Sequence, residues 1–154
     1  MDLFDVIVVG AGIGGISSAV PAARTGAGTL LVDSNEHIGG TGVHSPLGLL
    51  CGCGPRADFW CNEGVLQEFF PHLWGIDRAK EKLWYYDSND LAERYATVTA
   101  KEPNLTVWSA TTLQSVKVGA GKAIQSIRVA GKHHADVAGK VFIDGTADGN
   151  LSAL

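Results

Sequence analysis

The sequence has no long hydrophobic run, no basic cluster and little charge of either sign. No stretch of about 18 apolar residues occurs, so no transmembrane helix is predicted. The first residues lack the positive start and long apolar stretch of a secretory signal. No basic run of five or more residues occurs, and the net charge of −4 gives no electrostatic reason to bind nucleic acid or an anionic membrane. We therefore expect a cytoplasmic protein that binds neither of these partners.

Cysteine is also scarce. The three cysteines, Cys51, Cys53 and Cys61, are odd in number and do not form the pattern of a disulfide framework. A C-x-C spacing lacks the second pair that a structural zinc site requires, so no metal site is predicted. We interpret these residues as structural thiols kept reduced, with a redox pair as the alternative.

The composition is that of one folded domain. The 154 residues are 45% apolar and only 18% charged, which favours a globular chain with a hydrophobic core over a disordered one. A chain of this length has room for one such core. Residues 1–154 are therefore predicted to form a single domain.

Residues 5–33 predict a βαβ unit. Residues 5–9 are a short apolar, β-branched run ended by glycine, which is typical of a buried parallel strand. Residues 13–25 predict a helix of small residues that stops before Gly26, and residues 29–32 predict a second strand. Two strands joined by one helix over so short a distance indicate a right-handed crossover.

The rest of the chain predicts a loop, a helix and a group of β-strands. Residues 39–55 are rich in glycine and have no period, so we expect a loop with one helical turn. Residues 55–88 form an aromatic-rich insertion, which we expect to pack on the core, with a substrate-pocket wall as the alternative. A helix capped by Ser88 or Asn89 is expected over residues 89–101. Strands are expected at residues 105–108, 112–118, 123–130 and 135–143, arranged as a hairpin or meander, with a loop at 144–150. The predicted fold class is α/β, with a Rossmann-like parallel sheet and a small β-meander.

A glycine-rich turn lies between the first strand and the first helix. Gly10, Gly12 and Gly15 fit the pattern G-x-G-x-x-G, whose glycines allow a tight turn, close approach of a pyrophosphate and close helix–strand packing. The N-terminus of the following helix offers free N–H groups to phosphate. Asp33 ends the second strand, where a carboxylate accepts hydrogen bonds from ribose hydroxyls and repels the 2′-phosphate of NADP. The pattern predicts a bound dinucleotide and is compatible with FAD or NAD.

The sequence resembles the FAD-dependent oxidoreductases that have a glutathione-reductase-like FAD domain. The pattern of that family continues past the third glycine, and this chain matches it at Ala19, Gly26, Asp33 and the pair Gly39–Gly40. In relatives the Gly-Gly pair lets the backbone pass close to the cofactor phosphates and leads toward the flavin.

A second resemblance lies near the end of the chain. The family commonly has the run Asp-Ala-Thr-Gly-Asp-Gly after a β-meander, and residues 144–149 correspond to it. Thr146 and Asp148 keep their places. Gly145 stands where alanine is usual and Ala147 where glycine is usual, a departure that bears on close backbone approach at residue 147.

The resemblance implies that the chain is the N-terminal part, or a fragment, of a flavin-dependent oxidoreductase with FAD as cofactor. The pyrophosphate would lie at the glycine-rich turn and the ribose at Asp33, and a substrate domain or partner chain would lie outside this part. The residues expected to bind the cofactor are Gly10, Ala11, Gly12, Ile13, Gly14, Gly15, Asp33, Ser34, Gly39, Gly40, Thr41, Thr146 and Asp148. No catalytic residue and no substrate are predicted.

Two other functions stay open. The first is an NAD-binding Rossmann protein, because Asp33 suits NAD as well, although Gly39–Gly40 and the meander favour FAD. The second is a non-catalytic, truncated flavoprotein module that needs a partner chain. Pro21 inside the first helix, Ala147, and a helix that starts at residue 151 just before the chain stops are consistent with that second alternative.

Overall fold

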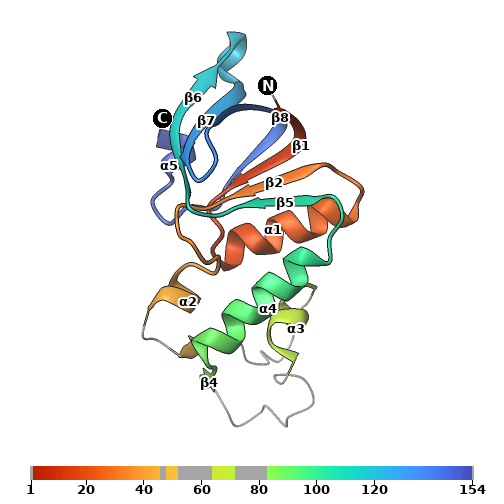
Figure 1. Cartoon of the computed structure of the whole chain (residues 1–154), viewed down its shortest axis with the longest axis vertical. Helices are drawn as coiled ribbons and strands as arrows, with labels where there is room; N and C mark the ends of the chain where they lie inside the picture. The colour runs from red at the N-terminus through yellow and green to blue at the C-terminus, as the bar shows by residue number, and fades with distance from the viewer. Residues whose placement is uncertain (1, 46–47, 52–63, 72–82, 154) are drawn as a thin grey trace.

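A six-stranded sheet forms the centre of the computed structural model, which describes residues 2–45, 48–51, 64–71 and 83–153 (Figure 1). Its strands are β1 (Asp2–Val9), β2 (Thr29–Val32), β5 (Leu105–Trp108), β6 (Thr111–Val118), β7 (Ile124–Gly131) and β8 (Ala135–Asp144). In space they follow the order β5-β2-β1-β8-β7-β6. The first four are parallel neighbours, whereas β8–β7 and β7–β6 pair antiparallel. This mixed sheet with its helices confirms the α/β fold class.

The predicted βαβ unit forms the middle of the sheet. β1 pairs with β2 from Val6↔Thr29 to Val9↔Val32, and α1 (Ile13–Arg24) connects the two strands. On its other side β1 pairs in parallel with β8. β2 is therefore buried along its whole length, and β1 from residue 7 onward. Burial on both faces explains why these strands are continuous apolar runs without polar alternation.

β5 belongs to the parallel part of the sheet. It follows α4 (Ser88–Ala100) and pairs with β2 from Thr29↔Leu105 to Val32↔Trp108. Grouping residues 105–108 with the antiparallel strands was therefore wrong. A helix ahead of a strand provides the long crossover that parallel pairing needs, whereas tight turns join antiparallel neighbours.

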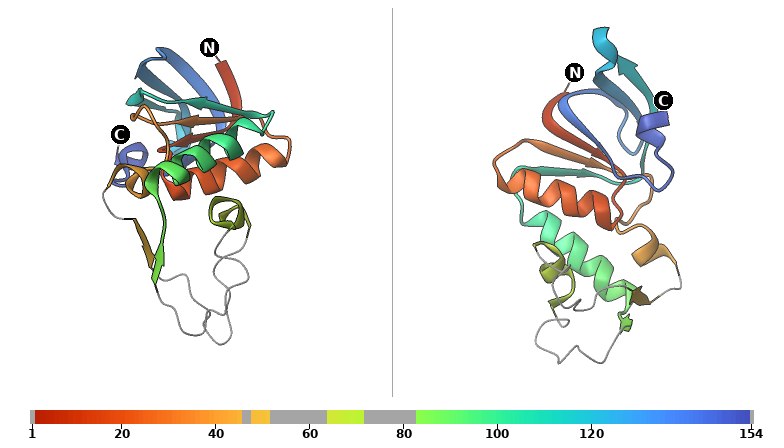
Figure 2. Two further views of the ribbon diagram at one scale, coloured as in Figure 1. Left: turned by 60° about the horizontal axis from the view of Figure 1, so that its bottom comes forward. Right: turned by 180° about the vertical axis from the view of Figure 1, so that it is seen from behind.

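The antiparallel strands β6, β7 and β8 form the predicted meander. A short 3₁₀ turn, η2 (Ala120–Lys122), joins β6 to β7, and β7 pairs with β8 from Ser126↔Ala138 to Val129↔Ala135. These strands bend over one face of the parallel strands, while α1 and α4 lie side by side on the other face (Figure 2). The sheet therefore has protein on both faces.

Five short elements complete the described part of the chain. They are α2 (Thr41–His44), β3 (Leu49–Cys51), α3 (Leu66–Phe69), β4 (Leu83–Tyr85) and α5 (Asn150–Ala153). α2 is the helical turn expected within residues 39–55, whereas β3 was not predicted. β3 pairs antiparallel with β4, which lies more than thirty positions further along the chain, and no local period marks so short a strand. Cys53, Cys61 and the aromatic residues Phe59, Trp60 and Trp74 lie outside the described residues.

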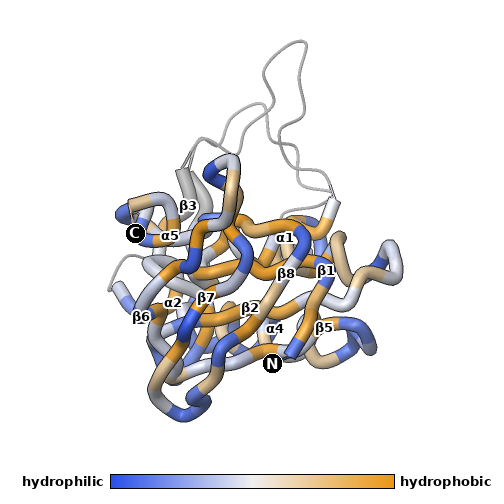
Figure 3. Tube along the Cα trace, turned by 90° about the horizontal axis from the view of Figure 1, so that it is seen from above, coloured by the Kyte–Doolittle hydropathy of each residue, from blue (hydrophilic) through white to orange (hydrophobic). Residues whose placement is uncertain are grey.

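Two hydrophobic cores hold the sheet between its covering layers. Successive residues of β1 and β2 point to opposite faces, so Val8 and Leu31 belong to the core on the helix side, and Ile7 and Leu30 to the core beneath the meander. In Figure 3 the hydrophobic colour follows the central strands and the hydrophilic colour lies on peripheral turns. The helix-side core contains Val8, Ala11, Ile16, Ala19, Val20, Leu31, Ile38, Val65, Phe69, Phe70, Leu91, Tyr95 and Val98.

The cap of α4 lies one residue earlier than predicted. The carboxylate of Asp87 accepts hydrogen bonds from the backbone N–H groups of Asn89 (2.7 Å) and Asp90 (3.2 Å). Ser88 and Asn89, the two residues predicted as caps, already lie inside the helix. Asp and Ser have similar cap preferences, so composition alone does not distinguish adjacent candidates.

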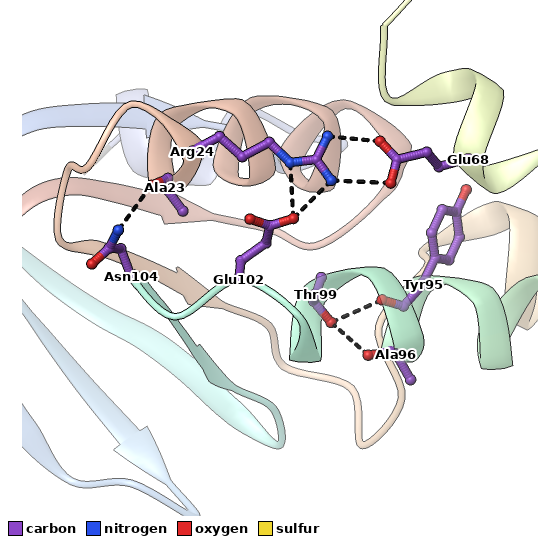
Figure 4. Close-up of polar contacts among 8 residues, drawn as sticks. All are labelled: Ala23, Arg24, Glu68, Tyr95, Ala96, Thr99, Glu102 and Asn104. Carbon is purple, nitrogen blue, oxygen red and sulfur yellow. Dashed lines mark hydrogen bonds and ion pairs between the residues drawn. The ribbon is translucent and has the colours of Figure 1, made fainter.

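Arg24 at the end of α1 ties three elements together (Figure 4). Its guanidinium donates to both carboxylate oxygens of Glu68 in α3, at 2.6 and 3.0 Å, and to Glu102 after α4 at 2.8 Å. The hydrogen bonds to Glu68, and then those to Glu102, raise the pKa of Arg24. Because the side chains of Arg24 and Glu68 are about two-fifths exposed, solvent screens their ion pair. We therefore expect the pair to orient α3 on α1 and to add little to the free energy of unfolding.

Candidate functional site

Three glycines pack backbone against backbone where β1 and β8 end and α1 begins. Gly10 has a φ of +94°, which favours glycine, and its N–H donates to the carbonyl of Val32 at 2.7 Å. A Cβ on Gly15 would lie 1.8 Å from the carbonyl oxygen of Gly10, and a Cβ on Gly145 would lie 2.7 Å from that same oxygen. The turn, the helix and the β8 end can therefore meet only because none of the three residues has a side chain.

The other two glycines of the turn face open space. A Cβ on Gly12 or Gly14 would meet no protein atom within 4 Å. Gly12 precedes α1 with ordinary φ and ψ values of −72° and −178°, and no side chain caps the helix. Within the described residues, nothing accepts a hydrogen bond from the N–H groups of Ile13 and Gly14. An uncovered helix N-terminus with donors and no side chains is a cradle for an anion, so these residues fit a pyrophosphate.

The Gly39–Gly40 pair passes directly beside this cradle. The N–H of Gly39 donates to the carbonyl of Ala11 at 2.7 Å. Gly40 has a φ of 55°, and a Cβ there would lie 2.9 Å from the Cα of Gly12. The loop after β2 is thus hydrogen-bonded to the glycine-rich turn and extends the same surface.

Asp33 is 7% exposed and its carboxylate is bonded within the chain. One oxygen, Oδ2, accepts from the backbone N–H of Ala11 at 2.6 Å. The other, Oδ1, accepts from the backbone N–H and side-chain amide of Asn35, at 2.8 and 2.9 Å. A carboxylate has about four acceptor positions, so roughly one stays open for a ligand hydroxyl. Sequence reasoning assigned Asp33 to a ribose and did not foresee that it also holds the glycine-rich turn to the end of β2.

These segments line one cavity of about 920 Å³ at the carboxyl ends of the parallel strands. A crevice in this position is where open α/β sheets bind ligands. Ala11 and Gly15 are buried behind the cavity wall and do not line it. The predicted residues that line it are Gly10, Gly12, Ile13, Gly14, Asp33, Ser34, Gly39, Gly40, Thr41, Thr146 and Asp148.

The sequence profile of the family described as "FAD dependent oxidoreductase" matches residues 5–154. The chain belongs to this family. Among curated relatives, it is 28% identical over 145 residues to carotenoid 3,4-desaturase of Haloarcula japonica, a match that covers 90% of this chain and 28% of the desaturase. It is 30% identical over 105 residues to glutathione reductase of Schizosaccharomyces pombe, with 60% of this chain and 21% of the reductase covered.

Solved structures agree with this assignment at the level of the fold. A probable FAD-dependent monooxygenase from Pseudomonas aeruginosa superposes with a TM-score of 0.61 and 16% identity, over 92% of this chain and 42% of the monooxygenase. The chain thus spans less than a third of the two curated relatives and less than half of that structure. Within the described residues, no helix is long and apolar enough to cross a membrane.

The cavity beside the glycine-rich turn is also lined by residues that were not among the predicted cofactor-binding residues. One group is apolar or aromatic and the other comes from the start of β6. Phe70 and Tyr86 belong to the aromatic-rich insertion, for which a substrate-pocket wall was the alternative prediction. Tyr95 lies outside that insertion in an ordinary helix, so no local signal marked it. The cavity residues missed entirely include Leu49, Leu91, Tyr95, Thr111, Thr112, Leu113 and Gln114.

Asp144 organises the C-terminal turn of this flavoprotein-family domain. Its Oδ1 accepts from the N–H and hydroxyl of Thr146, at 3.1 and 2.6 Å, and its Oδ2 accepts from the N–H and hydroxyl of Ser152, both at 2.9 Å. The hydroxyl of Thr146 in turn accepts from the N–H of Asn150 at 2.8 Å. Thr146, which was predicted to bind cofactor, therefore uses its side chain inside the turn, while the residue still lines the cavity.

Asp144→Asn is expected to cost about 1–2 kcal/mol of folding stability at pH 7, because an amide cannot accept hydrogen bonds at both of its ends. Burial alone would raise the pKa of Asp144, but its hydrogen bonds with Thr146 and Ser152 outweigh burial and lower it. A lowered folded-state pKa means that the carboxylate stabilises the fold above the unfolded pKa of about 4 and loses this contribution as the pH falls through the folded value. The deficit of the variant, measured by urea unfolding, should therefore narrow between pH 6 and about pH 3. A deficit that stays constant over this range would contradict the assignment.

Proposed function

We propose that this chain is the FAD-binding part of a flavin-dependent oxidoreductase, with the pyrophosphate held at the N-terminus of α1. One observation carries the proposal. Gly12 and Gly14 line the open cavity, and a Cβ added to either would meet no protein atom within 4 Å. The glycines around them are instead packed tightly against other backbone. Empty space at two glycines beside unpaired helix N–H groups is the environment that a bound pyrophosphate requires.

The adenosine half of the cofactor is assigned to the Asp33 side of the cavity. The remaining acceptor position of the carboxylate takes one ribose hydroxyl, and Ser34 and Thr112 line the cavity next to it. The negative charge of Asp33 disfavours a 2′-phosphate, so NADP is expected to bind more weakly than NAD or FAD.

When bound, FAD supplies the redox chemistry, and the protein supplies binding and orientation. The residues proposed to contact it along the cavity are those of the glycine-rich turn, the Gly39–Gly40 pair and the backbone at Thr146. No residue of this chain is proposed as an acid, base or nucleophile. In this proposal a further domain or a partner chain binds the substrate.

The proposal is tested by titrating the purified chain with FAD, NAD and NADP. FAD should bind, and flavin absorbance should persist with the protein through gel filtration. NAD binding without FAD binding would favour the alternative of an NAD-binding Rossmann protein. A colourless chain that binds no dinucleotide would overturn the proposed function.

Gly12→Ala should weaken FAD binding roughly 10- to 100-fold, the effect of losing one charge-assisted hydrogen bond to phosphate. Its φ of −72° suits alanine, and the new methyl group meets no protein atom within 4 Å, so folding should be unchanged. The methyl group would occupy the space assigned to the pyrophosphate. Isothermal titration of both proteins measures the change in Kd.

Gly28→Ala serves as the matched control. This residue lies between α1 and β2, at the opposite end of the helix from Gly12, and a Cβ there would make an ordinary 3.5 Å contact with Asp5. Its FAD affinity should equal that of the unmodified chain. If the Gly12→Ala variant bound FAD as tightly as the unmodified chain, the pyrophosphate could not be assigned to the glycine-rich turn.

A further inference from the structure

The hydroxyl group of Tyr95 is buried and has no hydrogen-bond partner among the residues that the structure describes. Tyr95 lies on α4, is 1% exposed, and packs its ring edge-to-face on Phe69 with the ring centres 4.7 Å apart. Within the described residues, no group accepts a hydrogen bond from its hydroxyl or donates one to it. Burial, together with the neighbouring Tyr86, raises the pKa of Tyr95, so the hydroxyl stays protonated and is a donor at neutral pH.

The position of Tyr95 indicates which group could accept a hydrogen bond from its hydroxyl. Tyr95 lines the same cavity as the glycine-rich turn. It also lies beside Gly39, since a Cβ added to Gly39 would be 3.1 Å from its Cδ2 atom. A buried hydroxyl that lacks a partner destabilises a fold, so such groups nearly always bond to protein, water or ligand.

The surroundings of Tyr95 differ from the Asp33 end of the cavity. Phe70 and Tyr86, whose rings meet edge-to-face at 5.7 Å, line the cavity together with Leu49 and Leu91. The Asp33 end instead presents carboxylate, amide and hydroxyl groups. An apolar, aromatic-walled end suits a planar ring, and one donor within it orients a ring that has acceptor atoms.

We propose that the Tyr95 hydroxyl donates a hydrogen bond to an acceptor atom, a carbonyl oxygen or ring nitrogen, on the flavin ring of the bound dinucleotide. This inference rests on the proposed function. The two ends of the cavity then divide the ligand: Asp33 takes the ribose of the adenosine half, Gly12 takes the pyrophosphate, and the Tyr95 end takes the ring.

Tyr95→Phe separates this role from a structural one. The variant should weaken FAD binding about fivefold, the effect of one neutral hydrogen bond, and leave ADP binding unchanged because ADP has no flavin ring. Without ligand, its thermal unfolding midpoint should equal or exceed that of the unmodified chain, because a buried hydroxyl without a partner is removed. The absorption bands of bound flavin should also shift, because the hydrogen bond to the ring is lost.

Tyr85→Phe is the matched control, since Tyr85 is 76% exposed and should change none of these quantities. Unchanged FAD affinity in the Tyr95 variant would overturn the inference while leaving the proposed function intact. A lowered unfolding midpoint without ligand would also overturn it, because the hydroxyl would then have a protein partner. Failure of the unmodified chain to bind FAD would overturn the proposed function and this inference together.

Discussion

Gly15→Ala should lower the free energy of unfolding by about 3 kcal/mol or more, at the upper end of the range for overpacked sites. The added Cβ would lie 1.8 Å from the carbonyl oxygen of Gly10 and 3.0 Å from its carbonyl carbon. These backbone atoms have little freedom to move, because the N–H of Gly10 bonds to Val32 in β2 and that of Gly145 bonds to Val9. Urea unfolding, followed by circular dichroism, measures the difference.

Gly14→Ala is the control for this prediction. It introduces the same methyl group one residue earlier in α1, where nothing lies within 4 Å. Replacing glycine by alanine in a helix should raise stability by about 0.5–1 kcal/mol, so the two adjacent variants are expected to differ in sign. Equal stability of the two variants would show that α1 does not pack on the turn through Gly15.

Asp33→Asn should destabilise the ligand-free chain by about 2 kcal/mol, because it leaves a buried donor without an acceptor. The carboxylate accepts from Ala11 at one oxygen and from Asn35 at the other. An amide of the same shape has only one oxygen, so its NH₂ group must face the N–H of Ala11 or the donors of Asn35. Urea unfolding in the absence of any nucleotide measures the loss.

Asp148→Asn makes the same chemical change in the same cavity at an exposed position. In the described part of the chain no group bonds to the Asp148 carboxylate, so this variant should be as stable as the unmodified chain. If Asp33 served only a ligand, its variant would also be neutral without nucleotide. A neutral Asp33→Asn would thus reduce its role to the ribose contact.

Local pattern was sufficient to predict most of the secondary structure. The apolar run of β1, the helix of small residues after the glycines and the β2 run ending at Asp33 are each set by neighbours a few positions apart. The edge strand β5 was located correctly along the sequence but given the wrong neighbours. The neighbour with which a strand pairs depends on the connection that precedes it, here the helix α4. The four residues of the strand do not specify that connection.

Part of the glycine packing beside the cavity was also predictable, because a close backbone approach restricts a position to one residue type. Gly10, Gly15 and Gly145 meet other backbone, and the first two of these carry a recognisable spacing. Tyr95 shows the opposite case. A tyrosine in a helix with an apolar face is ordinary in sequence, and only the packing reveals a buried hydroxyl beside the cavity.

From the sequence alone, the α/β class, the βαβ unit, the meander and the family followed, because each depends on short-range periodicity or on glycines at a fixed spacing. The tertiary structure alone decided that Asp33 bonds to Ala11, that Asp144 holds the C-terminal turn, and that Phe70, Tyr86 and Tyr95 line the same cavity. The bonds of Asp144 span at most eight positions, but the Asp33–Ala11 bond spans 22 and the aromatic residues come from separate segments. These features depend on where hydrogen-bonding groups and rings come to lie once the hydrophobic faces of the sheet are covered.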